Sequence, residues 1–117
     1  MRLFLRYMPQ LFFVALALVT ILSLIPSDAV PQAFQFWDKA QHALAYTVLA
    51  IMGSLAFPRQ LKLVLLGLLA HGAAIEVMQS TLTTTRLGDV LDWFADGTGV
   101  IAGIGIYRYL LAKVLKQ

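Results

Sequence analysis

The sequence predicts an all-α fold, a four-helix transmembrane bundle with short loops and both termini in the cytoplasm. Three observations support this prediction. The chain of 117 residues is 60% hydrophobic and only 13% charged, whereas a soluble domain of this size needs far more polar surface. The apolar residues fall into four stretches near the roughly 20 residues that a spanning helix needs. All six acidic residues lie at the same ends of these stretches, and most basic residues lie at the opposite ends.

Composition also excludes several classes of protein. The formal net charge is +3, but the basic residues are dispersed over three loops rather than gathered in one patch, which argues against nucleic-acid binding. The chain has no cysteine, so disulfides, thiolate metal sites and cysteine nucleophiles are excluded. No linker or internal repeat divides the sequence, and we expect one domain over residues 1–117.

The first predicted span covers residues 5–25. It follows Arg2 and Arg6 and ends before Pro26, because proline lacks the backbone donor that a continuing helix requires. The stretch resembles the apolar core of a signal peptide, and residues 27–29 form a loose cleavage-like site. Since the apolar run is longer than the usual signal core, we expect an anchor that is not cleaved.

The second and third predicted spans, residues 36–57 and 61–79, form an antiparallel helical hairpin. Only three residues separate them, and so short a connection places consecutive helices side by side. A polar loop with few helix-forming residues follows over residues 80–86. The fourth predicted span covers residues 90–111 and ends in a basic segment.

The distribution of Lys and Arg predicts the orientation in the membrane. Both termini and the turn at residues 58–62 carry the excess of basic residues, and such segments usually stay in the cytoplasm. The loops at residues 26–37 and 80–91 should then face outward. Trp37 and Trp93 both fall at the outer interface in this topology, where amphipathic aromatic rings are favoured.

Three of the predicted helices carry polar side chains on one face near their outer ends. These residues recur every three or four positions, which is the spacing of one helix face. They are Asp38, His42 and Tyr46 on the second span, Glu76 and Gln79 on the third, and Asp89, Asp92 and Asp96 on the fourth. Gly99 and Gly103 continue the face of the fourth span and permit close helix approach. We expect the three faces to border one polar pocket.

The charge of this pocket raises the question of a bound cation. Five carboxylates, at positions 38, 76, 89, 92 and 96, accompany only two cations, Lys39 and Arg86. Such an excess needs compensation at the edge of a low-dielectric layer, either by protonation of a carboxyl group or by a bound cation. Oxygen ligands suit Mg²⁺, Ca²⁺ or Mn²⁺, and His42 would admit Zn²⁺. Without a closely spaced ligand motif, the sequence leaves the presence of a divalent cation open.

Structural roles compete with a binding site for the same residues. An ion-pair network in which Glu76 or Asp92 meets Arg86 or Lys39 would hold the helices together. For Asp38, solvation in the headgroup region is an equally good explanation.

The two histidines and Tyr46 also admit simpler roles. His42, four residues after Asp38, could be a ring held by a carboxylate, a metal ligand or a general base. A hydrogen-bonding histidine remains the simplest interpretation. His71 is not on the face of Glu76, and we expect it to form hydrogen bonds between helices. Tyr46 could donate to a ligand or serve in packing.

These polar positions resemble the VanZ-like family of small bacterial integral membrane proteins. The resemblance rests on Asp38-Lys39-x-x-His42-x-x-x-Tyr46, on Glu76-x-x-Gln79, on Arg86-x-x-Asp89-x-x-Asp92, and on a polar residue at 96 followed by Gly99. It covers residues 37–103 and implies a multi-pass protein of the bacterial cytoplasmic (inner) membrane. The founding member's link to teicoplanin resistance implies a role in the cell envelope. The family usually has Asn where this chain has Asp96.

Three functions are compatible with these residues. The first is binding of an envelope lipid or a lipid-linked glycan precursor, with Arg86 and Lys39 contacting phosphate or carboxylate groups. The second is a small intramembrane enzyme in which Glu76 or Asp92 acts as acid, base or metal ligand, His42 as base and Arg86 as a stabiliser of negative charge. The third, an ion or proton carrier, is weakened because the inner halves of the helices hold almost no ionisable residues.

Overall fold

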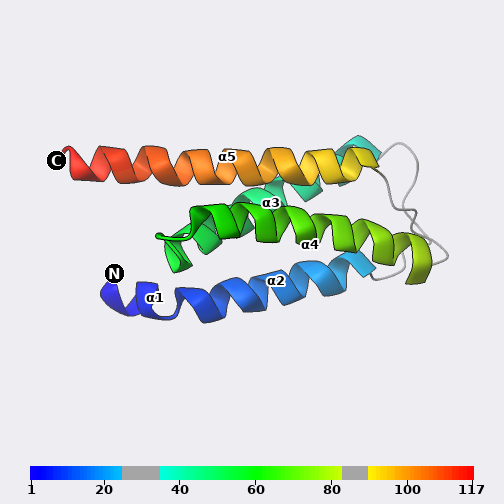
Figure 1. The fold of residues 1–117 in the computed structure, drawn as a ribbon, viewed down its shortest axis with the longest axis horizontal. Coiled ribbons are helices and arrows are strands. Elements are labelled where there is room, and N and C mark those ends of the chain that lie inside the picture. The colour runs from blue at the N-terminus through cyan, green and yellow to red at the C-terminus, as the bar shows by residue number, and fades with distance from the viewer. Residues whose placement is uncertain (25–34, 83–89) are drawn as a thin grey trace.

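The computed structural model describes residues 1–24, 35–82 and 90–117, without the side chains of residues 35–38 and 82. These residues form α-helices and contain no strand (Figure 1), which confirms the predicted all-α fold. The helices of this part of the chain are α1 (Arg2–Arg6), α2 (Met8–Leu24), α3 (Gln35–Ala56), α4 (Leu61–Leu82) and α5 (Val90–Leu115).

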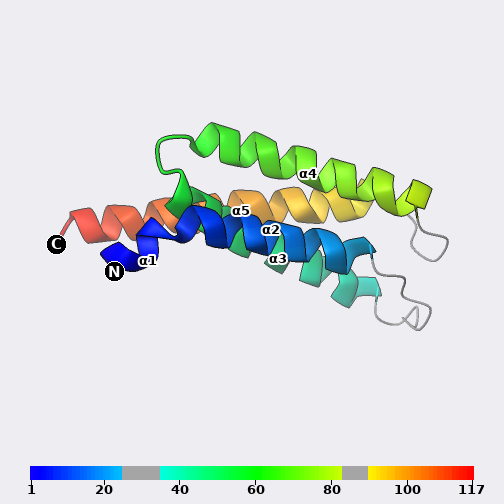
Figure 2. The same cartoon turned by 90° about the horizontal axis from the view of Figure 1, so that it is seen from below.

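The four longer helices run along one axis of an elongated bundle that measures 50 × 24 × 22 Å. Both termini and the turn between α3 and α4 lie at one end (Figures 1 and 2). We call this the basic end, because Arg2, Arg59 and Lys113 belong to it. The opposite end, where α2 and α4 finish and α3 and α5 begin, carries Glu76 and Asp92 and is called the acidic end. The charge sorting of the sequence is thus a sorting between two ends of one bundle.

The first predicted span is divided in the structure. Tyr7 separates α1 from α2, and the cause is Pro9. Its ring nitrogen cannot donate to the carbonyl of Leu5, so the helical hydrogen bonds are interrupted here. The sequence prediction of one continuous span from residue 5 therefore missed this break.

Two helices extend beyond their predicted ends. α4 continues past residue 79 to Leu82, and the hydroxyl groups of Ser80 and Thr81 donate to the carbonyls of Glu76 and Val77 at 3.0 and 2.8 Å. By bonding to the carbonyl four residues earlier, each hydroxyl finds its partner within the helix. α5 has 26 residues and is about 39 Å long at 1.5 Å per residue, which exceeds the roughly 30 Å hydrocarbon core of a bilayer.

The bundle places polar groups inside and large apolar groups outside. Among the residues whose side chains the structure describes, the buried polar ones are Ser54, Glu76, Gln79, Asp92 and Asp96. Large apolar side chains such as Leu22, Leu66 and Ile101 are more than half exposed, and so extensive an apolar surface indicates contact with another apolar phase. Within the described residues, Leu61–Thr81 of α4 and the whole of α5 are long and apolar enough to cross a membrane, and α2 is apolar but shorter. These features indicate a membrane protein.

The apolar core lies between α2, α3, α4 and α5. It consists of Phe12, Tyr46, Leu49, Ala50, Val64, Leu68 and Val100. Toward the basic end the rings of Phe12, Phe13 and Phe57 meet edge to face, with centroids 5.2 to 6.2 Å apart. Edge-to-face contact is a preferred geometry of aromatic pairs.

Candidate functional site

The close contact between α3 and α5 depends on two glycines. A Cβ atom added at Gly99 would overlap the carbonyl oxygen of Ala43, and one at Gly103 would lie 2.5 Å from the carbonyl oxygen of Thr47. Neither backbone group can move without shifting α3. The expectation that these glycines permit close helix approach is confirmed, and this approach brings the polar faces of α3 and α5 within hydrogen-bond distance.

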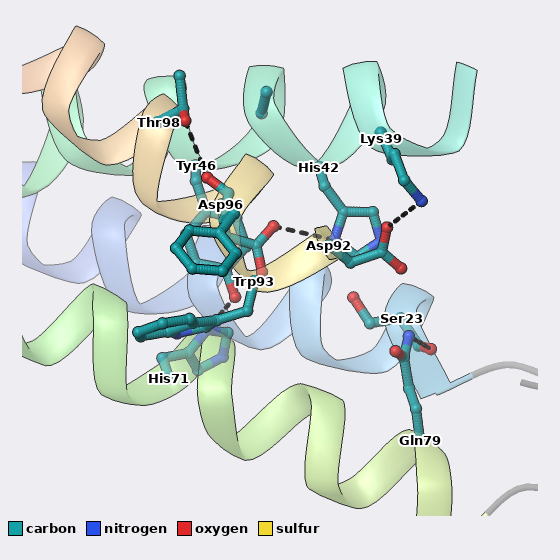
Figure 3. A network of polar contacts seen from close by, with 12 residues as sticks. Ser23, Lys39, His42, Tyr46, His71, Gln79, Asp92, Trp93, Asp96 and Thr98 are labelled. Atoms are coloured by element: carbon teal, nitrogen blue, oxygen red, sulfur yellow. Dashed lines mark hydrogen bonds and ion pairs between the residues drawn. The ribbon is translucent and has the colours of Figure 1, made fainter. Parts of the chain in front are cut away.

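His42 of α3 and Asp96 of α5 form a buried pair. His42 Nδ1 donates to Asp96 Oδ1 at 2.9 Å (Figure 3). Their side chains are 10% and 1% exposed, so the contact is shielded from solvent. The carboxylate that orients His42 thus comes from α5. The side chain of Asp38, which the sequence offered for this role, lies outside the described residues.

Lys39 and Asp92 form a second pair, one helical turn closer to the acidic end. Lys39 Nζ lies 3.0 Å from Asp92 Oδ1 (Figure 3). The side chain of Lys39 is 34% exposed and that of Asp92 is 8% exposed. The ion-pair alternative raised by the sequence therefore holds for Asp92. Because pairs of this exposure are partly screened by solvent, the contribution to stability is modest, about 1 kcal/mol or less.

α4 contributes Glu76 and Gln79, both buried. Gln79 Nε2 donates at 2.9 Å to the carbonyl oxygen of Ser23, in the last turn of α2 (Figure 3). Carbonyls in the last turn of a helix lack main-chain partners, so this bond fixes α4 against α2. Glu76 is 9% exposed and belongs to the same surface of α4.

Glu76 joins the pair formed by His42 and Asp96. One potential ligand atom from each of these three residues lies within 4.8 Å of the other two. We call these three residues the carboxylate–histidine cluster. Three helices supply it, and each residue is brought in by helix packing rather than by closeness in sequence.

A separate chain of hydrogen bonds crosses the bundle nearer its middle. Thr20 donates to the carbonyl of Leu16 at 2.8 Å, and its oxygen lies 2.8 Å from His71 Nε2. Tyr46 Oη lies 2.8 Å from His71 Nδ1. Because the single hydroxyl hydrogen of Thr20 is used, Nε2 must carry the imidazole hydrogen, and Nδ1 accepts from Tyr46. His71 is thus a hydrogen-bonding group between helices, as the sequence predicted.

α4 and α5 meet at Gly72. Trp93 Nε1 donates to the carbonyl oxygen of Leu69 at 3.0 Å. A Cβ added at Gly72 would lie 3.1 Å from Asp96 Oδ2 and 3.3 Å from Trp93 Cδ1. The glycine therefore provides space beside the carboxylate of Asp96 while the indole of Trp93 closes one side (Figure 3).

Two grooves on the surface of the bundle reach residues of the cluster. One, of about 370 Å³, lies between α4 and α5 and is lined by Glu76, Ser80 and mainly apolar residues. The other, of about 200 Å³, is bordered by α2 and α3 and reaches His42 and Tyr46. Each groove thus combines apolar walls with at least one polar group.

The structure describes only some of the site residues that the sequence predicts. Arg86 and Asp89, like the side chain of Asp38, lie outside the described residues. Tyr46 is 1% exposed and bonded to His71, so ligand binding by Tyr46 stays a prediction. Sequence reasoning missed Thr20 and Ser23. Their presence in the otherwise apolar second half of the first span could have indicated that they form hydrogen bonds between helices.

The fold and the buried polar groups define a helical membrane protein with a carboxylate–histidine cluster near one end. The chain matches the VanZ/LLP1 family model over residues 4–113, and it belongs to this family. No curated protein and no solved structure matches it.

Proposed function

We propose that this protein is a multi-pass protein of the bacterial cytoplasmic membrane that binds the headgroup of an envelope lipid or of a lipid-linked glycan precursor at its acidic end. Four spans, with the basic end in the cytoplasm, would place this end at the outer leaflet. The observation that carries the proposal is the groove between α4 and α5, which has apolar walls and the buried carboxylate of Glu76 among its lining groups.

The groove suits an amphiphilic ligand. Val77 and Trp93 line it with apolar surface, which would contact a hydrocarbon chain. Glu76 and the hydroxyl of Ser80 would accept hydrogen bonds from sugar hydroxyls or amines. Lys39 is partly exposed and would attract a phosphate near the membrane surface. Arg86, which lies outside the described residues, is expected from its charge to have the same role.

A role in glycopeptide resistance would follow from such binding. A teicoplanin-like molecule carries an acyl chain and acts at the outer leaflet. A protein that sequesters or alters lipids there would change how much of the molecule reaches its target. This part of the proposal rests on the family resemblance together with the position of the groove.

An intramembrane enzyme is the second candidate, and one observation favours it. The imidazole of His42 is oriented by the carboxylate of Asp96 at 2.9 Å, and Glu76 lies beside this pair. A carboxylate-held imidazole next to a second carboxyl group is an arrangement that serves general acid–base catalysis. The smaller groove would give a substrate access to His42.

Lipid retention by the purified full chain tests the proposal. Wild type would be exchanged into nanodiscs containing bacterial polar lipids and a polyprenyl phosphate, and the co-purifying lipids would be measured by mass spectrometry. We expect Val77→Trp, which fills the groove, and Glu76→Gln to lower retention of the bound lipid about tenfold, or about 1.4 kcal/mol. Leu66→Trp is the matched control, because Leu66 lies on the same helix as Val77 and is similarly exposed but does not line this groove.

The same experiment separates the two candidates. Saturable retention without any new lipid product supports binding. Turnover of a lipid by wild type and not by Glu76→Gln supports the enzyme instead. Equal retention by wild type, Val77→Trp and Leu66→Trp would refute a role for the groove.

A further inference from the structure

We propose that His42, Glu76 and Asp96 form a binding site for one divalent transition-metal ion, with Zn²⁺ as the best fit. The side chains come from α3, α4 and α5, and one ligand atom of each lies within 4.8 Å of the others. Two ligands of a tetrahedral Zn²⁺ lie roughly 3.3 Å apart at bond lengths of about 2.0–2.1 Å. Side-chain movements of about 1 Å would therefore complete the site, with the ion bound to a ring nitrogen of His42 that carries no hydrogen; if that nitrogen is Nδ1, the ion replaces the hydrogen that Nδ1 shares with Asp96 Oδ1.

The carboxylate of Asp96 provides independent support. Asp96 is completely buried, and its Oδ1 accepts from His42, but its Oδ2 has no hydrogen-bond partner among the described residues. A buried carboxylate oxygen without a donor or a cation is strongly unfavourable. A metal ion beside it would remove this penalty.

The direction of this oxygen is given by Gly72. A Cβ added at Gly72 would lie 3.1 Å from Asp96 Oδ2, so the oxygen faces α4. Gly72 stands four residues before Glu76, on the same face of that helix. Oδ2 is therefore directed toward the side of α4 that carries the second carboxylate, and the glycine leaves space beside it.

The ligand types select the metal. Mg²⁺ and Ca²⁺ prefer oxygen ligands alone, whereas one imidazole and two carboxylates suit Zn²⁺ and its neighbours in the transition series. Three protein ligands leave a fourth position open, as in zinc sites that bind a water or another small ligand. Two carboxylates also balance the charge of the ion. Asp92 is excluded from the set because Lys39 neutralises it.

Metal binding by the tag-free full chain in detergent tests the proposal directly. After equilibrium dialysis against Zn²⁺, we expect one metal ion per chain by elemental analysis. Co²⁺ in its place should give the visible absorption bands of a low-coordinate site, and Zn²⁺ should abolish them. X-ray absorption at the zinc edge should show imidazole coordination. Absence of stoichiometric metal, or a zinc site without imidazole, would overturn the proposal.

Two conservative variants locate the site. Asp96→Asn keeps the shape of the side chain and an acceptor for His42, so it should fold, yet it should weaken Zn²⁺ binding at least about 100-fold. Asp92→Asn, one turn away, should change the dissociation constant less than threefold. Equal weakening by both variants would show nonspecific attraction to acidic groups and would reject the site.

This inference does not depend on lipid binding. The metal measurements contain no envelope lipid, so their failure would leave the proposed headgroup function untouched. Conversely, a chain that binds Zn²⁺ but retains no lipid would preserve the metal site and reject the headgroup function.

Discussion

The two ends of the bundle are stabilised by different interactions. At the basic end, Phe12 and Phe57 pack with aromatic centroids 6.0 Å apart, in a region without ion pairs among the described residues. At the acidic end, Lys39 with Asp92 and His42 with Asp96 join α3 to α5. Apolar packing tolerates substitution by other apolar groups of similar volume, whereas a buried polar pair requires one particular partner. The acidic end should therefore tolerate fewer substitutions than the basic end.

This contrast supports placing the proposed function at the acidic end. Inside a membrane, polar and ionisable groups are costly to bury and usually serve a function. A contribution to stability is enough to explain the aromatic packing at the basic end. Stability alone does not explain the carboxylate–histidine cluster, because apolar side chains would fill the same space at a lower cost in free energy.

Removing the aromatic packing should give the largest loss of stability. Phe12→Ala leaves a cavity where a 7%-exposed ring contacts Phe13 and Phe57, and we expect the free energy of unfolding to fall by about 3 kcal/mol. Phe94→Ala is the matched control, since Phe94 is 60% exposed. Thermal unfolding in detergent measures both. Equal losses would show that aromatic packing does not stabilise the basic end.

Separating α3 from α5 should have the next largest effect. Gly99→Ala forces a methyl group against the carbonyl of Ala43, and we expect it to lower the free energy of unfolding by about 2 kcal/mol despite the better helix propensity of alanine. Gly105→Ala is the control, because nothing lies within 4 Å of its added Cβ. That variant should be neutral or up to about 1 kcal/mol more stable. A stable Gly99→Ala protein would contradict the close approach.

The hydrogen-bond chain through His71 allows a finer test. Tyr46→Phe removes the donor to His71 Nδ1, and we expect a loss of about 1–2 kcal/mol, since a buried acceptor is left without a partner. Nitrogen NMR of wild type should show His71 as the neutral tautomer with hydrogen on Nε2. If Nδ1 carries the hydrogen in wild type, the proposed direction of the chain is wrong.

Much of the fold could be predicted because each helix is determined locally. The apolar stretches and prolines gave helices close to those observed, and charge sorting correctly separated the two ends. Pro9 caused an error because its break lies within an otherwise apolar run. The end of α4 was placed too early because Ser80 and Thr81 favour loops by propensity, yet in the structure their hydroxyls bond to the preceding turn.

The site was only partly predictable. Helical spacing placed His42, Glu76 and Asp96 on polar faces, but spacing cannot say which residues from different helices will meet. The sequence suggested Asp38 as a partner of His42, which stays a prediction because that side chain lies outside the described residues, and it did not suggest the contact of His42 with Asp96. It offered Asp92 both as a site residue and as an ion-pair partner of Lys39, and the structure shows the ion pair.

The helices, their apolar surfaces and the segregation of charge follow from the sequence alone, because each depends on residues that are close together in the chain. Which polar groups pair is set by the packing of the helices. Pairing depends on how closely α3 and α5 approach at Gly99 and Gly103, and on the rotation of α4 that brings Glu76 to the other two helices. These are contacts between residues distant in sequence, and local pattern carries no information on their distances.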